Sequence, residues 1–123
     1  MKILLIGKNG QLGKSLSTLI SKIKKRHKYI FVGRDELDLS LASDISSYFE
    51  DKSFDIIINC AGFTAVDNAE KEIELANQIN HLAVAQLAEI AKETNAKLIH
   101  ISTDYVFDGK TDKPYLEGEQ TNP

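Results

Sequence analysis

The chain has 123 residues, enough for one small domain. Its formal net charge of -3 argues against a nucleic-acid partner, which would favour a basic surface. A single cysteine, Cys60, excludes an internal disulfide, and no apolar run approaches the roughly 20 residues that a membrane helix needs. We therefore expect a soluble, cytoplasmic protein that binds neither nucleic acid nor membrane.

Strand and helix patterns alternate along the chain. Short apolar runs predict strands over 2–6, 29–32, 55–59 and 97–102, and apolar residues at helical spacing predict helices over 11–25, 43–51 and 72–93. Ser43 is the expected N-cap of the second helix, and 103–123 is polar and predicted to be loop. Four strands separated by three helices predict an α/β fold, a Rossmann-like doubly wound parallel sheet that stops after about four strands. The unbroken Ile56–Ile58 run predicts a strand covered on both faces.

A glycine-rich turn joins the first strand to the first helix. It reads Gly7-Lys8-Asn9-Gly10-Gln11-Leu12-Gly13, a G-x-x-G-x-x-G variant of the dinucleotide fingerprint. Gly7 suits a tight turn, Gly10 lets the backbone approach a pyrophosphate, and Gly13 lets the helix pack closely. The free N–H groups of the helix N-terminus favour phosphate. The turn predicts nucleotide binding without naming a reaction.

The end of the second strand reads the adenosine ribose in such folds, where an acidic residue suits NAD and a basic one NADP. Arg34 stands where a 2′-phosphate would lie, which favours NADPH. Two alternatives stay open: Asp35 could bind the ribose hydroxyl instead, or Arg34 could be a surface residue paired to Asp35 or Glu36. Asp38, in the following loop, could reach the adenine side.

The third and fourth strands also end in residues suited to a ligand. Ala61 and Gly62 are small and leave room over the strand end, and Thr64 follows with a hydroxyl. Ser102 and Thr103 carry hydroxyls that could hydrogen-bond a carbonyl oxygen during hydride transfer, or could equally be turn caps. No histidine or cysteine has metal-ligand spacing, so no metal site is predicted.

Three segments carry a family resemblance. They are the turn 7–13, the segment Asn59-Cys60-Ala61-Gly62-Phe63-Thr64-Ala65-Val66-Asp67-Asn68-Ala69-Glu70, and the segment Ser102-Thr103-Asp104-Tyr105-Val106-Phe107-Asp108-Gly109. Together they resemble the dTDP-4-dehydrorhamnose reductases, which are extended short-chain dehydrogenase/reductases. The resemblance runs over essentially the whole chain.

The resemblance implies a reaction and a set of residues. Such reductases take hydride from NADPH or NADH and reduce the 4-keto group of dTDP-6-deoxy-L-lyxo-4-hexulose, giving dTDP-L-rhamnose; some use Mg²⁺, and the full-length form would be a possible homodimer. Thr103 would then be the catalytic hydroxyl, and Thr103 with Asp104 would meet the dTDP-sugar. The residues implied or predicted to contact the cofactor are Gly7, Gly10, Gln11, Leu12, Gly13, Arg34, Asp38, Leu39, Ala61, Gly62, Phe63 and Thr64.

One feature of the resembled family does not occur in the polar segment 103–123. Its proton-donating tyrosine and its lysine follow the spacing Tyr-x-x-x-Lys, whereas Tyr105 is followed at that offset by Gly109 and Tyr115 by Glu119. We expect residues 1–123 to be an incomplete NAD(P)-binding Rossmann domain, a fragment without its substrate domain and inactive by itself.

Two other interpretations stay open. The chain also resembles a non-catalytic, NADP-binding regulatory subunit, the beta subunit of methionine adenosyltransferase. It could otherwise be a remnant that no longer folds, since four parallel strands leave an exposed sheet edge.

Overall fold

A computed structural model describes residues 1–23, 26–65, 71–103 and 105–122. Four strands form one parallel sheet in the order β2-β1-β3-β4. The α/β, Rossmann-like class predicted from the alternation of strands and helices is confirmed. The strands are β1 (Lys2–Ile6), β2 (Lys28–Val32), β3 (Ile56–Asn59) and β4 (Lys97–His100).

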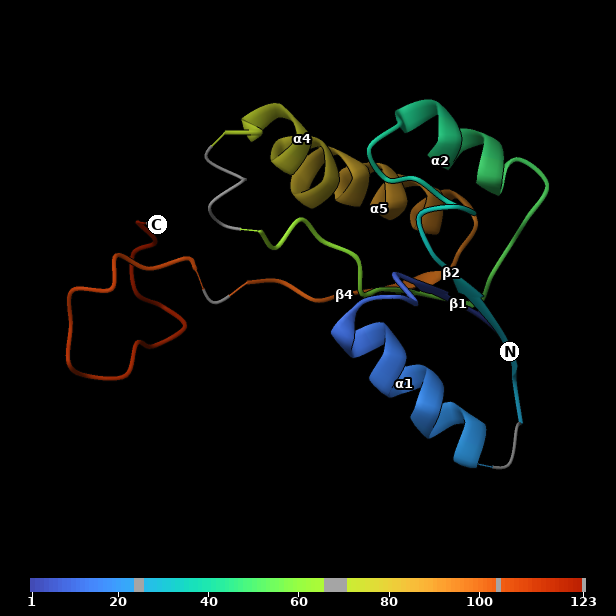
Figure 1. Cartoon of the computed structure of the whole chain (residues 1–123), viewed down its shortest axis with the longest axis horizontal. Coiled ribbons are helices and arrows are strands. Elements are labelled where there is room, and N and C mark those ends of the chain that lie inside the picture. Colours follow the sequence, from blue (N-terminus) through green and yellow to red (C-terminus); the bar gives the residue numbers. More distant parts are fainter. Residues whose placement is uncertain (24–25, 66–70, 104, 123) are drawn as a thin grey trace.

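Helices lie on both sides of the sheet (Figure 1). One side carries α1 (Gln11–Lys22). The other carries α2 (Ala42–Phe49) and a long helix in three parts: α4 (Ile73–Asn77), the π-turn η1 (Gln78–Leu82) and α5 (Ala83–Glu93). Over the described ranges, no helix has the length and apolar character needed to cross a membrane.

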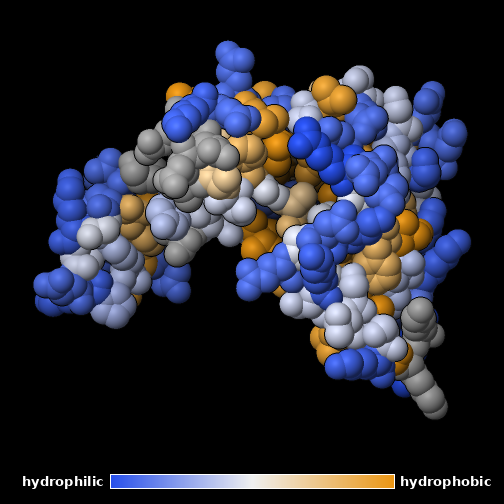
Figure 2. Space-filling view, viewed as in Figure 1, coloured by the Kyte–Doolittle hydropathy of each residue, from blue (hydrophilic) through white to orange (hydrophobic). Residues whose placement is uncertain are grey.

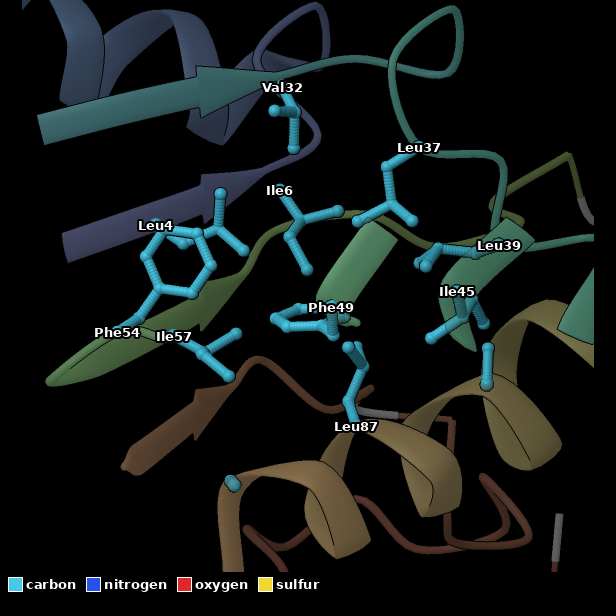
Figure 3. Close-up of a cluster of buried hydrophobic side chains, with 12 residues drawn as sticks. Leu4, Ile6, Val32, Leu37, Leu39, Ile45, Phe49, Phe54, Ile57 and Leu87 are labelled. Carbon is cyan, nitrogen blue, oxygen red and sulfur yellow. The ribbon is translucent and has the colours of Figure 1, made fainter. Parts of the chain in front are cut away.

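The main core lies between the sheet and the second helical layer (Figure 3). Leu4 of β1 stands in register with Ile57 of β3, and both are at most 1% exposed. They pack in one cluster with Phe49 of α2 and Leu87 of α5. Since successive strand residues point to opposite faces, alternate residues of each strand build this core and carry the strand ends to the same edge.

The opposite face of the sheet is less well covered. Ile57 is buried, but Ile56 and Ile58 are half-buried, and Ile99 of β4 is 47% exposed. β3 is therefore buried on one face and only partly covered on the other, which corrects the expectation that both faces are covered. The reason is that α1 is the one helix on this side among the described residues, whereas α2 and the long helix 73–93 cover the other side.

Several element boundaries differ from their predictions. The first helix ends at Lys22, and the fourth strand ends at His100. Ser43 is not the N-cap of α2: Leu41 is, without a side-chain cap. The acidic residue of the first turn, Asp44, instead accepts a hydrogen bond from the Asp38 N–H at 2.7 Å, which ties the helix to the loop before it.

Candidate functional site

A cleft of about 880 Å³ lies across the carboxyl ends of the four strands. This is the edge at which doubly wound sheets bind ligands, and the volume suits a cofactor-sized molecule. The space-filling view is hollowed between the helices of the two layers, with apolar side chains in the hollow (Figure 2). Each strand contributes through the loop that follows it, so the sheet topology itself assembles the site.

The glycine turn forms the floor of the cleft. Gly7 has a φ of +87°, and a Cβ there would lie 2.7 Å from the Ala61 backbone nitrogen. Both the turn and its contact with the end of β3 thus require glycine. A Cβ on Gly13 would lie 2.1 Å from the Gly7 carbonyl oxygen, so close packing of α1 also requires glycine.

Gly10 has a different environment from the other two glycines. A Cβ there would meet the Gly7 oxygen at 3.5 Å, an ordinary contact. Gly10 is the N-cap of α1 without a side-chain cap, and the first turn holds no acidic residue. The N–H groups and the positive dipole end of α1 therefore face the cleft without a carboxylate of their own helix, as an anion site needs.

The end of β2 carries two ion pairs. Lys8 pairs with Glu36, whose second oxygen accepts the Gly33 N–H at 2.8 Å. The bonds from Lys8 and then Gly33 hold the pKa of the Glu36 carboxyl below its ordinary value. Arg34 is 71% exposed, and its Nε lies 3.0 Å from Asp38. The alternative that Arg34 pairs with Asp35 or Glu36 is wrong, since Asp38 is its partner.

Asp38 is fixed by several hydrogen bonds. Its Oδ1 accepts the Ser40 N–H at 2.9 Å and the Ser40 hydroxyl at 2.6 Å. Burial alone would raise the pKa of Asp38, but the bonds from Ser40 and Arg34 outweigh it and lower the pKa. Asp38 therefore lines the cleft as a charged, oriented acceptor beside Leu39.

The end of β3 is held by a buried amide. Asn59 is 0% exposed; its Oδ1 accepts the Ala61 N–H at 3.0 Å, and its Nδ2 lies 3.3 Å from His100 Nδ1. Cys60 lines the cleft, and burial raises the pKa of its thiol. Asn59 thus turns the chain into the small-residue segment that forms the next wall.

Phe63 and Asn80 form the next contact along this wall. Asn80 of η1 accepts the Phe63 N–H at 2.8 Å and donates its Nδ2 to the Phe63 carbonyl at 3.0 Å. Ile79 of the same turn lines the cleft. The sequence analysis missed Asn80, because nothing in the local pattern links it to a backbone 17 residues away.

The structure brings most of the predicted cofactor residues to one cleft. The lining includes Gly7, Gly10, Gln11, Leu12, Arg34, Asp38, Leu39, Ala61, Gly62, Phe63 and Thr64. Gly13 lies beneath the floor instead. Ser102 also lines the cleft. Thr103 is exposed and does not line it, and the Thr103 Oγ1 accepts the Tyr105 N–H at 3.0 Å. Asp104 lies outside the described residues, so its role, like Thr103's, stays a prediction.

Comparison with known proteins identifies the family. The family described as RmlD substrate binding domain matches residues 1–123. The chain belongs to this family. It is 40% identical over 124 residues to the dTDP-4-dehydrorhamnose reductase of Escherichia coli, and 38% identical over 123 residues to that of Burkholderia thailandensis. Both matches include 100% of this chain, but only 42% of the Escherichia coli reductase and 40% of the Burkholderia thailandensis reductase. The chain therefore spans about two fifths of the length of these relatives.

Solved structures agree with that family. A dTDP-4-dehydrorhamnose reductase from Clostridium acetobutylicum superposes with a TM-score of 0.91 at 37% identity, over 100% of this chain and 43% of that one. The reductase from Bacillus anthracis, in complex with NADP, superposes with a TM-score of 0.85 at 34% identity, over 99% of this chain and 43% of that one. The family resemblance predicted from the three sequence segments is confirmed.

Proposed function

We propose that residues 1–123 form the NAD(P)H-binding part of a dTDP-4-dehydrorhamnose reductase. The observation that carries the proposal is the cleft across four strand ends, with a glycine turn and the N-terminus of α1 at its floor. This arrangement suits a dinucleotide pyrophosphate. The whole protein would reduce the 4-keto group of dTDP-4-dehydro-L-rhamnose to give dTDP-L-rhamnose. The reductase is preferred over the regulatory subunit because the relatives described above are reductases.

The two halves of the cofactor would take different strand ends. By the rule for this architecture, the adenosine ribose lies at the end of β2 and the pyrophosphate over the glycine turn. The nicotinamide half then extends over the ends of β3 and β4, beside Gly62, Phe63 and Ser102. When bound, the cofactor supplies the hydride; the residues of this chain hold it at that edge of the sheet.

Arg34 would give NADPH an advantage over NADH. It lines the cleft at the end of β2, and its exposed guanidinium can exchange Asp38 for a 2′-phosphate. Arginine forms bidentate bonds with phosphate, and a bond to a charged group contributes about 1.5–3 kcal/mol. Asp38 would instead accept a ribose hydroxyl of NADH, so binding of both cofactors is expected with NADPH the tighter.

Calorimetric titration of the 123-residue chain with NADPH and NADH tests the proposal. We expect both to bind, and Arg34→Met to weaken NADPH by about tenfold while changing NADH by less than about twofold. Asp35→Asn is a matched control, because it changes a neighbouring charge outside the cleft lining. Failure of both dinucleotides to bind would refute the proposal, and equal weakening of both would refute the role of Arg34.

The chemical step is expected to need more than these residues. The Tyr-x-x-x-Lys spacing occurs once in the sequence, at Tyr48 and Lys52, and neither residue lines the cleft. The pair that would protonate the developing alkoxide in the resembled family is therefore not among the residues of this site. We therefore expect the 123-residue chain to bind cofactor without oxidising NADPH when the dTDP-sugar is added. Turnover above background, followed as loss of the NADPH absorbance, would contradict this part of the proposal.

A further inference from the structure

The end of β2 carries no side chain at the position where dinucleotide-binding folds place an acidic one. In this architecture, a carboxylate about 20 residues after the glycine motif bonds the adenosine ribose. Counted from Gly13, that position is Gly33, which lines the cleft. Gly33 is not among the glycines with a positive φ, so the backbone conformation does not require glycine here. The requirement for glycine must therefore come from the space around it.

Side chains from two neighbouring turns fill this space. A Cβ at residue 33 would lie 2.7 Å from Asn9 Nδ2 and 3.3 Å from Lys8 Cε. It would also lie 3.4 Å from Glu36 Oε2, because the Glu36 carboxylate folds back to accept the Gly33 N–H at 2.8 Å. An amide, a lysine and a carboxylate therefore surround the position at which a side chain of β2 would otherwise stand.

Lys8 and Glu36 form an ion pair beside this position. Their side chains are 32% and 44% exposed, so solvent ions reach the pair. One oxygen of the Glu36 carboxylate bonds Lys8 and the other bonds the Gly33 N–H, which fixes the carboxylate in place. The bonds from Lys8 and then Gly33 hold the pKa of Glu36 below its ordinary value, so this carboxylate is ionised at neutral pH. The positive charge of Lys8 is thereby offset.

The charges of this pair concern one of the two cofactors more than the other. NADPH differs from NADH by a phosphate on the 2′ oxygen of the adenosine ribose, and that ribose is expected at the end of β2. A lysine ammonium binds phosphate as a point charge. The Glu36 carboxylate competes with the phosphate for Lys8 and also repels it. The balance between these two charges therefore acts on NADPH and leaves NADH nearly unaffected.

We propose that Glu36 is a specificity-determining residue, which holds Lys8 at the end of β2 and so limits the preference of the cleft for NADPH. Glu36 acts through Lys8, as a positioning residue, rather than by bonding the cofactor. The inference rests on the proposed function, which places the adenosine ribose at this strand end. It adds a second cation and carboxylate to the Arg34–Asp38 pair, and it explains how NADH would remain able to compete.

Three variants, each titrated calorimetrically with NADPH and NADH, test this role. Glu36→Gln keeps an oxygen for the Gly33 N–H but removes the charge that holds Lys8. NADPH should then bind about fivefold tighter, on the scale of an exposed ion pair, while NADH changes by less than about twofold. Lys8→Met leaves the Glu36 charge unopposed, so NADPH should bind about fivefold more weakly. The double variant lacks both charges and should return to within about twofold of the parent.

Asp35→Asn is the matched control, because it removes the same charge from the same loop and leaves the Lys8–Glu36 pair in place. It should change the ratio of NADPH affinity to NADH affinity by less than about twofold. Salt gives a second readout. Raising the ionic strength from about 0.01 M to about 1 M shortens the Debye length from about 30 Å to about 3 Å, so the opposite effects of Glu36→Gln and Lys8→Met should both shrink. Loss of a structural contact would instead weaken both cofactors at either salt concentration.

The outcomes separate the inference from the proposed function. Opposite shifts of the affinity ratio in Glu36→Gln and Lys8→Met, cancelled in the double variant, are the expected result. If both cofactors bind but the two folded single variants leave the ratio unchanged or shift it in the same direction, the inference is overturned and the proposed function stands. Failure of the parent chain to bind either dinucleotide would overturn the proposed function, and this inference with it.

Discussion

Gly13→Ala should destabilise the fold although alanine is the better helix former. A Cβ at residue 13 would lie 2.1 Å from the Gly7 carbonyl oxygen and 2.9 Å from the Gly7 carbonyl carbon. Since such contacts are not found below about 3.0 Å, α1 and the turn must separate by roughly 1 Å. The Gly7 oxygen cannot rotate away freely, because it accepts the Gly10 N–H at 3.1 Å.

The net cost follows from two opposing contributions. Overpacking costs about 1–3 kcal/mol, and the upper end applies because backbone atoms must move. Alanine returns about 1 kcal/mol through its higher helix propensity. The free energy of unfolding should therefore fall by about 2 kcal/mol, a large part of the 5–15 kcal/mol typical of a domain, and Tm by about 8 °C.

Urea denaturation followed by far-UV circular dichroism measures this change. Gly10→Ala is the control, since its Cβ would make an ordinary 3.5 Å contact. Its stability should stay within about 1 kcal/mol of the parent, the range of a changed N-cap, while its new methyl group enters the phosphate site and weakens NADPH binding. If Gly13→Ala is as stable as the parent, or Gly10→Ala is equally destabilised, the assignment of separate roles to these glycines fails.

Three further predictions concern side chains around the cleft. Hydrogen bonds from Ser40 and Arg34 hold the pKa of the Asp38 carboxyl below its ordinary value. The ionised form therefore stabilises the fold above the ordinary pKa of an aspartate, and this contribution is lost as the pH falls through the lowered pKa. Asp38→Asn should lower the free energy of unfolding by about 1 kcal/mol at pH 7, and urea denaturation should show this difference shrinking as the solution is acidified through that range. Cys60, whose thiol pKa is raised by burial, should react with iodoacetamide more slowly than glutathione does at pH 8, and more slowly still with NADPH bound; unchanged rates would contradict its place in the cleft. Asn59→Leu leaves the Ala61 N–H without its acceptor and should lower the free energy of unfolding by about 2 kcal/mol, so a neutral effect would show that water replaces the amide.

The parts of the fold set by local pattern could be predicted from the sequence. The strand ending at Ile6, the helix starting at Gln11 and the buried Ile57 each follow from short-range hydrophobic spacing. The strand ends then meet at one edge because all the strands are parallel. That topology is why most of the predicted cofactor residues line one cleft.

The parts that depend on distant partners could not be predicted. Arg34 has acidic residues on several sides in the sequence, and only the path of the loop selects Asp38 as its partner. Asn80 has a helical pattern around it, and its backbone partner lies 17 residues earlier. The prediction of Ser43 as the N-cap of α2 is wrong for a similar reason. Leu41 takes that position without a side-chain hydrogen bond, and Asp44 in the first turn accepts a bond from Asp38, which lies before the helix.

Charge on the last strand should reduce self-association of the 123-residue chain. β4 is an edge of the sheet as described, and its Ile99 side chain is 47% exposed on the face with less helical cover. An unpaired edge beside an exposed apolar side chain favours pairing between chains, and a lysine at such a position opposes it. Ile99→Lys should therefore lower the weight-average mass in sedimentation at high concentration. Because the Ile99 side chain is already half exposed, the Ile99→Lys substitution should change the free energy of unfolding of the chain by about 1 kcal/mol or less. Glu93→Gln, which also changes the net charge by +1 but at the exposed end of α5, is the control. Equal effects of the two variants on sedimentation would mean that net charge, rather than the strand edge, governs association.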